Sequence, residues 1–504
     1  MATLKTSLGE TIEFREEIHA VGAVKDVYLS VKGDKVAAFY RSHPGRNAYE
    51  RLSTIVGDYR ERILSIPYWA ELFCWPEALV EHKGKLGVVA PVYDRSFYFE
   101  YGSKNQDYLG IRGREKEGKW FASAFNQSKY LDERERGDWK AYLSVCELIA
   151  RAVRKMHAAG LAHSDLSYKN VLIDPVGVHA CIIDIDGLVV PGKFPPEVAG
   201  TPDFIAPEVM ATMHLPLDHP DRVLPSIATD RHALAVMVYM YLFYRHPLRG
   251  GRVHHPDPQI DETMLMGTKA TFVEHKHNLS NRPNLKNISP AYLPWADVQR
   301  IPYTASGPYL SPLFERAFVD GLHQPRQRPS ADEWEKALQY TKDVLLPCRS
   351  PDCKQKFFVY NETVQPECPF CRTPWTSGPF PYLYFYAGQN ERKLMDAARM
   401  VVLDNTSLHT WHVHRHIRPD ERLSESDALP VARFFRGGDY LKDWKMQNLR
   451  LPELHDENKV IPIGGDVDLV DGLTLGLSFG RQARVMSVKI VPAPDRIFRT
   501  VVAK

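Results

Sequence analysis

Residues 163–170 read His-Ser-Asp-Leu-Ser-Tyr-Lys-Asn, and a further carboxylate, Asp184, follows fourteen residues after Asn170. A carboxylate in such a loop can accept the proton of a reacting hydroxyl group. Amide and carboxylate oxygens are ligands that Mg²⁺ prefers in proteins. These residue types make Asp165 a candidate base, and Asn170 and Asp184 candidate metal ligands.

Landmarks further along the chain extend this pattern. Residues 200–208 read Gly-Thr-Pro-Asp-Phe-Ile-Ala-Pro-Glu, and Asp230 opens an apolar stretch. Arg328 stands where a partner for Glu208 is expected. Together these stretches resemble the catalytic loop, the metal-binding Asp and the following segment of eukaryotic-type protein kinases. The resemblance implies a bilobal, kinase-like α+β fold that uses ATP and Mg²⁺.

Lys169 lies four residues beyond the candidate base. Tyrosine-type kinases place an Arg at this position, where it neutralises the transferring phosphoryl group. The resemblance implies the same role for Lys169, and the alternative is a solvated loop lysine.

The pattern departs from that of most kinases after the metal-binding Asp and before the base. Residues 184–187 read Asp-Ile-Asp-Gly, so Asp186 either adds a carboxylate beside the metal or caps a turn. Ser164 replaces the Arg that often pairs with a phosphorylated activation segment, and residues 184–208 hold a single hydroxyl residue, Thr201. We therefore predict that activity does not depend on phosphorylation of this segment.

The strand that usually carries the ATP-anchoring lysine has none, since residues 36–41 read Val-Ala-Ala-Phe-Tyr-Arg. Upstream, residues 22–28 read Gly-Ala-Val-Lys-Asp-Val-Tyr, which places Lys25 on the last glycine position of a phosphate-binding loop that begins at Gly22. This resembles the kinases named for having no lysine in that strand. An ammonium group in the loop can still reach the phosphates of ATP.

Two readings of the missing lysine remain open. In the first the chain is an active kinase in which Lys25 substitutes for the strand lysine. In the second it is a nucleotide-binding pseudokinase scaffold. The carboxylate that should orient Lys25 is either Asp58 or Glu61, on a helix predicted over residues 47–64.

Four of the seven cysteines fall in a short window as two pairs, Cys348 with Cys353 and Cys368 with Cys371. Thiolate pairs in tight turns suit tetrahedral Zn²⁺. With four protein ligands no position is open for water, so the pattern predicts a structural zinc ribbon.

Composition and patterning divide the chain into several domains. At 504 residues it exceeds the usual size of one hydrophobic core. We expect an N-terminal kinase lobe over 11–95, a helical lobe over 96–346, the zinc ribbon over 347–377 and a β-rich domain over 380–504. The net charge of +2 gives no sign of a nucleic-acid binder. No apolar run is long enough to span a membrane, which favours a cytoplasmic protein.

Short apolar runs broken by turn residues predict an antiparallel sandwich over residues 380–504. Residues 444–449 and the Asp471-Gly472 turn resemble the second half of a forkhead-associated domain, a family that binds phosphothreonine. The first half lacks a clear match, which favours a divergent sandwich that docks partners. His412, His414 and His416 alternate, as expected for one face of a strand.

The kinase lobes, the Asp-x-Asp metal motif, Trp75-Pro76 and the trailing cysteines together resemble a bacterial group of kinases found in tellurite-resistance gene clusters. These kinases accompany a von Willebrand factor A protein and a PP2C-type phosphatase. The resemblance implies ATP- and Mg²⁺-dependent phosphorylation of Ser or Thr in an associated protein.

Overall fold

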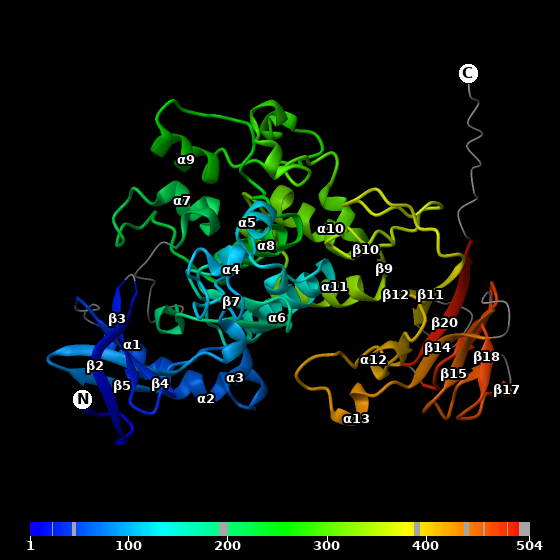
Figure 1. Cartoon of the computed structure of the whole chain (residues 1–504), viewed down its shortest axis with the longest axis horizontal. Coiled ribbons are helices and arrows are strands. Elements are labelled where there is room, and N and C mark those ends of the chain that lie inside the picture. The colour runs from blue at the N-terminus through cyan, green and yellow to red at the C-terminus, as the bar shows by residue number, and fades with distance from the viewer. Residues whose placement is uncertain are drawn as a thin grey trace. The chain divides into compact units, whose positions relative to one another are not determined.

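The structure is a computed structural model that describes residues 1–22, 24–42, 47–190, 200–387, 394–437, 443–456, 459–480 and 482–492. The chain divides into two compact units, the first comprising Met1–Tyr303 and Leu310–Lys336, the second Thr304–Tyr309 and Ala337–Lys504. Figure 1 shows their elements in chain order, from blue to red. Residues 191–199, which hold much of the predicted activation segment, lie outside the described residues.

The first unit opens with a six-stranded antiparallel sheet, drawn in blue in Figure 1. Its order is β1-β2-β3-β4-β6-β5. The bounds are β1 Ala2–Lys5, β2 Thr11–Val21, β3 Lys25–Ser30, β4 Lys35–Tyr40, β5 Ala78–His82 and β6 Lys85–Pro91. The hairpin that the sequence predicts at Gly33 joins β3 to β4, and this glycine has a φ of 76° that suits a tight turn. β1 precedes the boundary predicted at residue 11 and adds an edge strand to the sheet.

The helix predicted over residues 47–64 forms in three consecutive segments. They are α1 Ala48–Thr54, a π-helical turn Ile55–Tyr59 and α2 Arg60–Ile63. The π-helical turn changes the local helical period, and π-bulges of this kind often occur near functional sites. The buried positions of the helix are Ala48, Arg51, Leu52, Ile55, Val56 and Ile63.

The rest of the first unit is mainly helical. The helices are α3 Tyr68–Leu72, α4 Lys104–Asp107, α5 Ala124–Tyr130, α6 Trp139–Ala158, α7 Pro207–Thr212, α8 Ile227–Phe243, α9 Pro258–Met266, α10 Gly307–Glu315 and α11 Ala331–Asp343. The last two straddle the division between the units. A two-stranded sheet, β7 Val171–Asp174 with β8 His179–Ile182, follows the candidate catalytic loop.

α8 contains most of the longest apolar run of the sequence, and nearly all of its residues are buried. Ser226 and Thr229 form a capping box at its start. Among the described residues, no helix has the length and hydropathy needed to span a membrane.

The second unit begins with β9 Leu345–Pro347 and β10 Phe357–Val359, which pair in the cysteine-rich region. Two antiparallel sheets follow, with orders β12-β11-β20-β19-β16-β17 and β13-β14-β15-β18. Their bounds are β11 Phe380–Ala387, β12 Leu394–Val401, β13 Ser407–Leu408, β14 Ala432–Gly437, β15 Asp443–Asn448, β16 His455–Asp456, β17 Lys459–Val460, β18 Asp466–Asp468, β19 Thr474–Gly476 and β20 Arg484–Val491. Two short helices, α12 Thr410–Val413 and α13 Glu425–Ala428, complete the unit.

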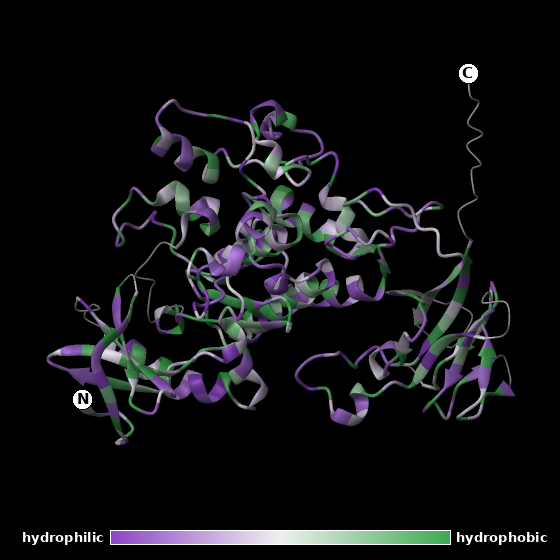
Figure 2. Cartoon of the chain, in the orientation of Figure 1, coloured by the Kyte–Doolittle hydropathy of each residue, from purple (hydrophilic) through white to green (hydrophobic). Residues whose placement is uncertain are grey.

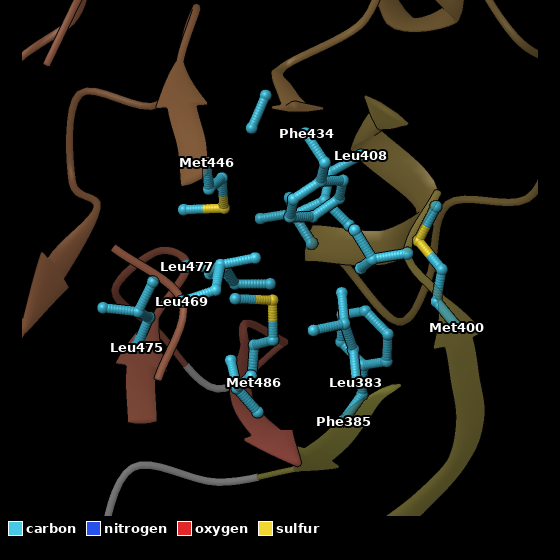
Figure 3. Packing of buried hydrophobic residues seen from close by; sticks show 14 of the residues in the cluster. Leu383, Phe385, Met400, Leu408, Phe434, Met446, Leu469, Leu475, Leu477 and Met486 are labelled. Carbon is cyan, nitrogen blue, oxygen red and sulfur yellow. The ribbon is translucent and has the colours of Figure 1, made fainter. Parts of the chain in front are cut away.

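Both sheets contribute buried side chains to one apolar core. Figure 3 shows Leu383 and Met486 from the first sheet close to Phe434 and Met446 from the second. β20 carries both hydrophobic and hydrophilic residues (Figure 2), and from Arg484 to Val488 buried and partly exposed positions alternate, as expected for a strand with one buried face.

The prediction that three histidines share one strand face is wrong, because His412 lies in α12. His412 instead forms a local cap with the backbone amide of His409, at 2.9 Å. Alternation in sequence does not distinguish a strand from a short capped turn.

Candidate active site

The catalytic loop is anchored to the start of α8 by Asp230, which is almost fully buried. Its carboxylate accepts hydrogen bonds from the backbone amides of His163 (2.7 Å) and Ser164 (3.2 Å). The ring of His163 also bonds to the carbonyl oxygen of Ile183 at 2.9 Å, next to Asp184. These contacts tie the candidate base to the candidate metal ligand.

Asp165 is oriented by two neighbours that the sequence separates widely. The amide nitrogen of Asn170 donates to both the carbonyl (2.8 Å) and the carboxylate (2.9 Å) of Asp165. The backbone amide of Thr201 donates to the other carboxylate oxygen at 2.6 Å. Because Asn170 uses its nitrogen in these bonds, its amide oxygen is the atom that can ligate a cation.

Asp184 and Asp186 flank a tight turn, in which Asp184 has a left-handed backbone conformation with φ of 60°. The Asp184 side chain is 47% exposed, whereas that of Asp186 is 6% exposed. An exposed carboxylate can take up a hydrated metal ion with little rearrangement, while a buried one needs a partner within the protein.

Lys25 is that partner. Its ammonium lies 2.8 Å from one oxygen of Asp184 and 2.8 Å from both oxygens of Asp186. In the β3–β4 ladder Lys25 stands directly opposite Tyr40, and Val27 opposite Ala38. Directly opposed residues share a face of the sheet, so Lys25 lies beside the position where the strand lysine is missing. The loop lysine predicted from the sequence thus reaches the Asp-x-Asp motif.

The charges of this cluster stabilise one another. Burial alone lowers the pKa of Lys25, but the carboxylates of Asp186 and Asp184 outweigh it and raise the pKa above its usual value. Burial raises the pKa of Asp186, and the ammonium of Lys25 reverses this and lowers it. Burial and Asp186 together raise the pKa of Tyr40. Lys25 is therefore an ammonium and Asp186 a carboxylate at neutral pH.

Gly22 begins the loop that carries Lys25. Its amide donates to the carbonyl of Lys25 at 2.8 Å, and its own carbonyl accepts from Arg41 at 2.5 Å. A Cβ at residue 22 would lie 3.4 Å from the Lys25 oxygen, which is ordinary contact. The turn therefore does not itself require glycine at this position.

Other predicted site residues stand apart from this cluster. Asp58 and Glu61 are both exposed, so neither supplies a buried counter-charge to Lys25. Lys169 is exposed as well, and its backbone amide donates to the hydroxyl of Ser167 at 3.3 Å. Lys169 therefore lies on the solvent-exposed surface of the candidate catalytic loop.

The segment after the catalytic loop is held as the sequence predicts. Arg328 donates to both oxygens of Glu208, at 2.8 and 2.7 Å, and its side chain is fully buried. A bidentate pair of this kind fixes orientation as well as distance.

His246 contacts the same segment through a hydrogen bond between its ring and the carbonyl oxygen of Asp203, at 2.9 Å. Burial lowers the pKa of His246 to about 4, although Asp203 partly opposes this shift. The folded pKa thus lies below the value of about 6.5 expected when unfolded. The stability that His246 contributes is complete above pH 6.5 and is lost as pH falls toward 4.

We expect the free energy of unfolding to fall by about 3 kcal/mol between pH 6.5 and 4 from His246 alone. Urea unfolding at several pH values measures this slope. The His246→Gln variant, which keeps a donor for Asp203, should show a slope reduced by about one proton between pH 5 and 6. An unchanged slope in the variant would contradict the assignment.

The four cysteines of the second unit form one cluster. Their sulfur atoms all lie within 4.8 Å of one another. The Cys348–Cys371 and Cys353–Cys368 sulfur pairs are 3.4 and 3.9 Å apart. The hydrogen bond between Cys353 and Cys368 lowers the pKa of the Cys353 thiol and raises the pKa of the Cys368 thiol. The donor set and spacing fit a tetrahedral Zn²⁺ site.

Comparison with known proteins agrees with this geometry. A family model described as the protein kinase domain matches residues 116–335. This region is therefore similar in sequence to protein kinase domains. The match begins beyond the first sheet, so the placement of Lys25 rests on the structure. In the sequence, Lys25 is identified by its position two residues before Val27.

Several curated kinases are similar to part of the chain. Serine/threonine-protein kinase PkaB of Streptomyces coelicolor is 30% identical over 132 residues, which cover 24% of this chain and 29% of that protein. Serine/threonine-protein kinase PknD of Chlamydia pneumoniae is 30% identical over 132 residues, covering 22% and 13%. The chain thus spans less than a third of the length of these relatives. Among solved structures, the Toxoplasma gondii specific rhoptry antigen kinase domain aligns with 16% identity and a TM-score of 0.33, over 52% of this chain and 76% of that one.

Two further side chains, Tyr40 and Asp186, belong to the cluster around Lys25. Tyr40, at the end of the strand that lacks the lysine, donates a hydrogen bond to Asp186. Asp186, for which the sequence predicts either a carboxylate beside the metal or a turn cap, has both oxygens 2.8 Å from the Lys25 ammonium. Both residues can be noticed in the sequence, Tyr40 in the strand without a lysine and Asp186 as the second Asp of the metal motif, but their contact cannot.

Proposed function

We propose that the chain is an ATP- and Mg²⁺-dependent kinase that phosphorylates Ser or Thr in a partner protein. The observation that carries the proposal is the convergence of Lys25 on Asp184, at 2.8 Å, beside a base that Asn170 and Thr201 hold in place. A phosphoryl-transfer site requires this combination of cation, metal ligands and base.

Each residue has a separable role in this mechanism. Asp165 would accept the proton of the substrate hydroxyl as it attacks the γ-phosphate. Asn170 and Asp184 would hold Mg²⁺, which neutralises charge on the phosphates when it is bound. Lys25 would bind the phosphate oxygens, and the exposed Lys169 would neutralise the transferring group.

The substrate and the setting follow from the family resemblance. A protein with a von Willebrand factor A domain is the proposed substrate, and a PP2C-type phosphatase would reverse the reaction, as in tellurite-resistance clusters. We place the reaction in the cytoplasm.

Phosphoryl transfer from labelled ATP tests the proposal. The purified chain is incubated with Mg²⁺ and the candidate substrate, beside an Asp165→Asn variant. Label on Ser or Thr that requires Asp165 supports the kinase. Nucleotide binding without transfer at any Mg²⁺ or Mn²⁺ concentration would instead support the pseudokinase scaffold.

For the second unit we propose a structural zinc ribbon over 347–377 and a docking role for residues 380–504. Four cysteine ligands leave no position for water, so Zn²⁺ would cross-link the chain without taking part in the reaction. The two sheets around one core support the sandwich fold. Its resemblance to forkhead-associated domains makes phosphothreonine a ligand to test.

Zinc analysis is expected to give about one Zn²⁺ per chain. Structural zinc contributes about 10–16 kcal/mol in small zinc-finger peptides, so a strong chelator should unfold the cysteine-rich region. Cys368→Ser should lose the metal, whereas Cys74→Ser, outside the cluster, should keep it. A metal-free wild type with unchanged thermal stability would refute the site.

A further inference from the structure

A buried ammonium needs a fixed counter-charge, and for Lys25 the carboxylates of Asp184 and Asp186 supply it. Its side chain is 14% exposed and contacts two carboxylates from the same short turn. Removing a charged group from water costs several kcal/mol unless a partner compensates. The two carboxylates differ in burial, so they need not serve the same purpose.

Asp186 is the more firmly held of the two. Both of its oxygens lie 2.8 Å from the Lys25 ammonium. The hydroxyl of Tyr40 donates a further hydrogen bond to the same carboxylate. Because Lys25 and Tyr40 are directly opposed in the sheet, two neighbouring strands hold Asp186 from one side.

The helix of residues 48–63 does not offer an alternative. Its acidic residues Glu50, Asp58 and Glu61 are all exposed. Its buried face carries a cation instead, since Arg51 is 5% exposed. The Arg51 guanidinium acts on the Tyr40 hydroxyl, where it opposes the rise in pKa. The exposure of Asp58 and Glu61 therefore does not support the expectation that one of them orients Lys25.

We propose that Asp186 is the carboxylate that positions Lys25 for the phosphates, a role that rests on the kinase function proposed above. Asp184, half exposed, is then available to the metal while Asp186 keeps hold of the lysine. The position of Lys25 depends on the turn after Asp184 and on Tyr40. On this proposal, no ion pair links the position of Lys25 to movement of the helix of residues 48–63.

A double-mutant cycle between Lys25 and Asp186 tests the proposal. Affinity for ADP without metal, affinity for ATP with Mg²⁺, kcat and thermal stability are measured for each variant. Misplacing a positioned group can cost about 10²-fold, so Asp186→Asn should lower kcat to this extent and weaken binding of metal-free ADP. In the Lys25→Met background Asp186→Asn should change both quantities by less than about twofold.

Conservative and matched variants complete the cycle. Asp186→Glu, which keeps the charge, should recover part of the loss. Asp58→Asn and Glu61→Gln, which remove exposed carboxylates of the helix, should behave as wild type. If Asp186→Asn fails to fold, Tyr40→Phe takes its place, because it removes one bond to Asp186 and no charge. Its smaller effect should likewise vanish without Lys25.

Three outcomes would overturn the proposal. Equal effects of Asp186→Asn with and without Lys25, together with a raised Mg²⁺ requirement, would make Asp186 a metal ligand. Loss of nucleotide affinity in Glu61→Gln or Asp58→Asn would return the role to the helix. Because metal-free ADP binding reports on Lys25 without turnover, the cycle can be read even if no phosphoryl transfer is found. If the wild type transfers phosphate but the effects of the Lys25 and Asp186 variants are additive, the positioning role of Asp186 is rejected while the proposed kinase function stands.

Discussion

The Asp165→Asn variant is expected to lower kcat by about 10²–10⁴-fold, the usual contribution of a general base. The amide cannot accept the proton of the substrate hydroxyl at neutral pH. Asn has nearly the same shape and still offers an oxygen to the Thr201 amide, which donates at 2.6 Å in the wild type. Nucleotide affinity should therefore stay close to the wild-type value, and phosphoryl transfer measures the loss.

A matched control separates chemistry from folding. Asp221→Asn makes the same isosteric change at a side chain that is 84% exposed, and its kcat should equal that of the wild type. Thermal unfolding of both variants shows whether the loop remains intact. An Asp165→Asn enzyme that keeps more than about a tenth of the wild-type kcat would exclude Asp165 as the base.

The Lys25→Met variant is expected to lose about 10²–10³-fold in kcat, the typical effect of removing one preorganised charge donor. Met fills a volume similar to that of the lysine stem but leaves Asp184 and Asp186 facing each other without the ammonium that bonds to both. Binding of ATP should weaken as well. Steady-state kinetics and equilibrium nucleotide binding measure the two effects separately.

Lys35→Met is the matched control, because Lys35 lies in β4 and pairs with Glu77 at 2.8 Å, away from the cluster. It should retain wild-type activity. A lysine restored opposite residue 25, in Lys25→Met/Tyr40→Lys, should recover activity by about tenfold over the single variant, which is part of the roughly 10²–10³-fold that one preorganised charge contributes, because the new ammonium starts from the neighbouring strand. Full activity of Lys25→Met would end the relocation hypothesis.

Much of the site could be predicted from the sequence because its parts are local. The base and its Asn partner lie five residues apart within one loop, and Asp184 follows a short hairpin. Paired cysteines and a missing strand lysine are equally visible in short windows. The partnership of Glu208 with Arg328, although distant in sequence, followed from the resemblance to kinases and is confirmed by the bidentate contact.

Other features could not be predicted, and each depends on packing. The strand β1 joins the edge of the first sheet from outside the predicted lobe, because its register with β2 is a tertiary choice. The helix of residues 48–63 shows no buried carboxylate once its inward face is known. Helical period alone does not distinguish that face where a π-helical turn shifts the spacing.

The sequence by itself predicted the chemistry on offer: a candidate base at Asp165, candidate metal ligands at Asn170 and Asp184, and a candidate phosphate-binding cation at Lys25. Only the tertiary structure decided which groups pair. Lys25 and Asp186 are 161 positions apart, and no periodicity links residues at such a distance. Their partnership arises because β3 and β4 place Lys25 and Tyr40 on one face, opposite the turn that carries Asp186. Burial of that carboxylate then makes the ammonium its necessary partner.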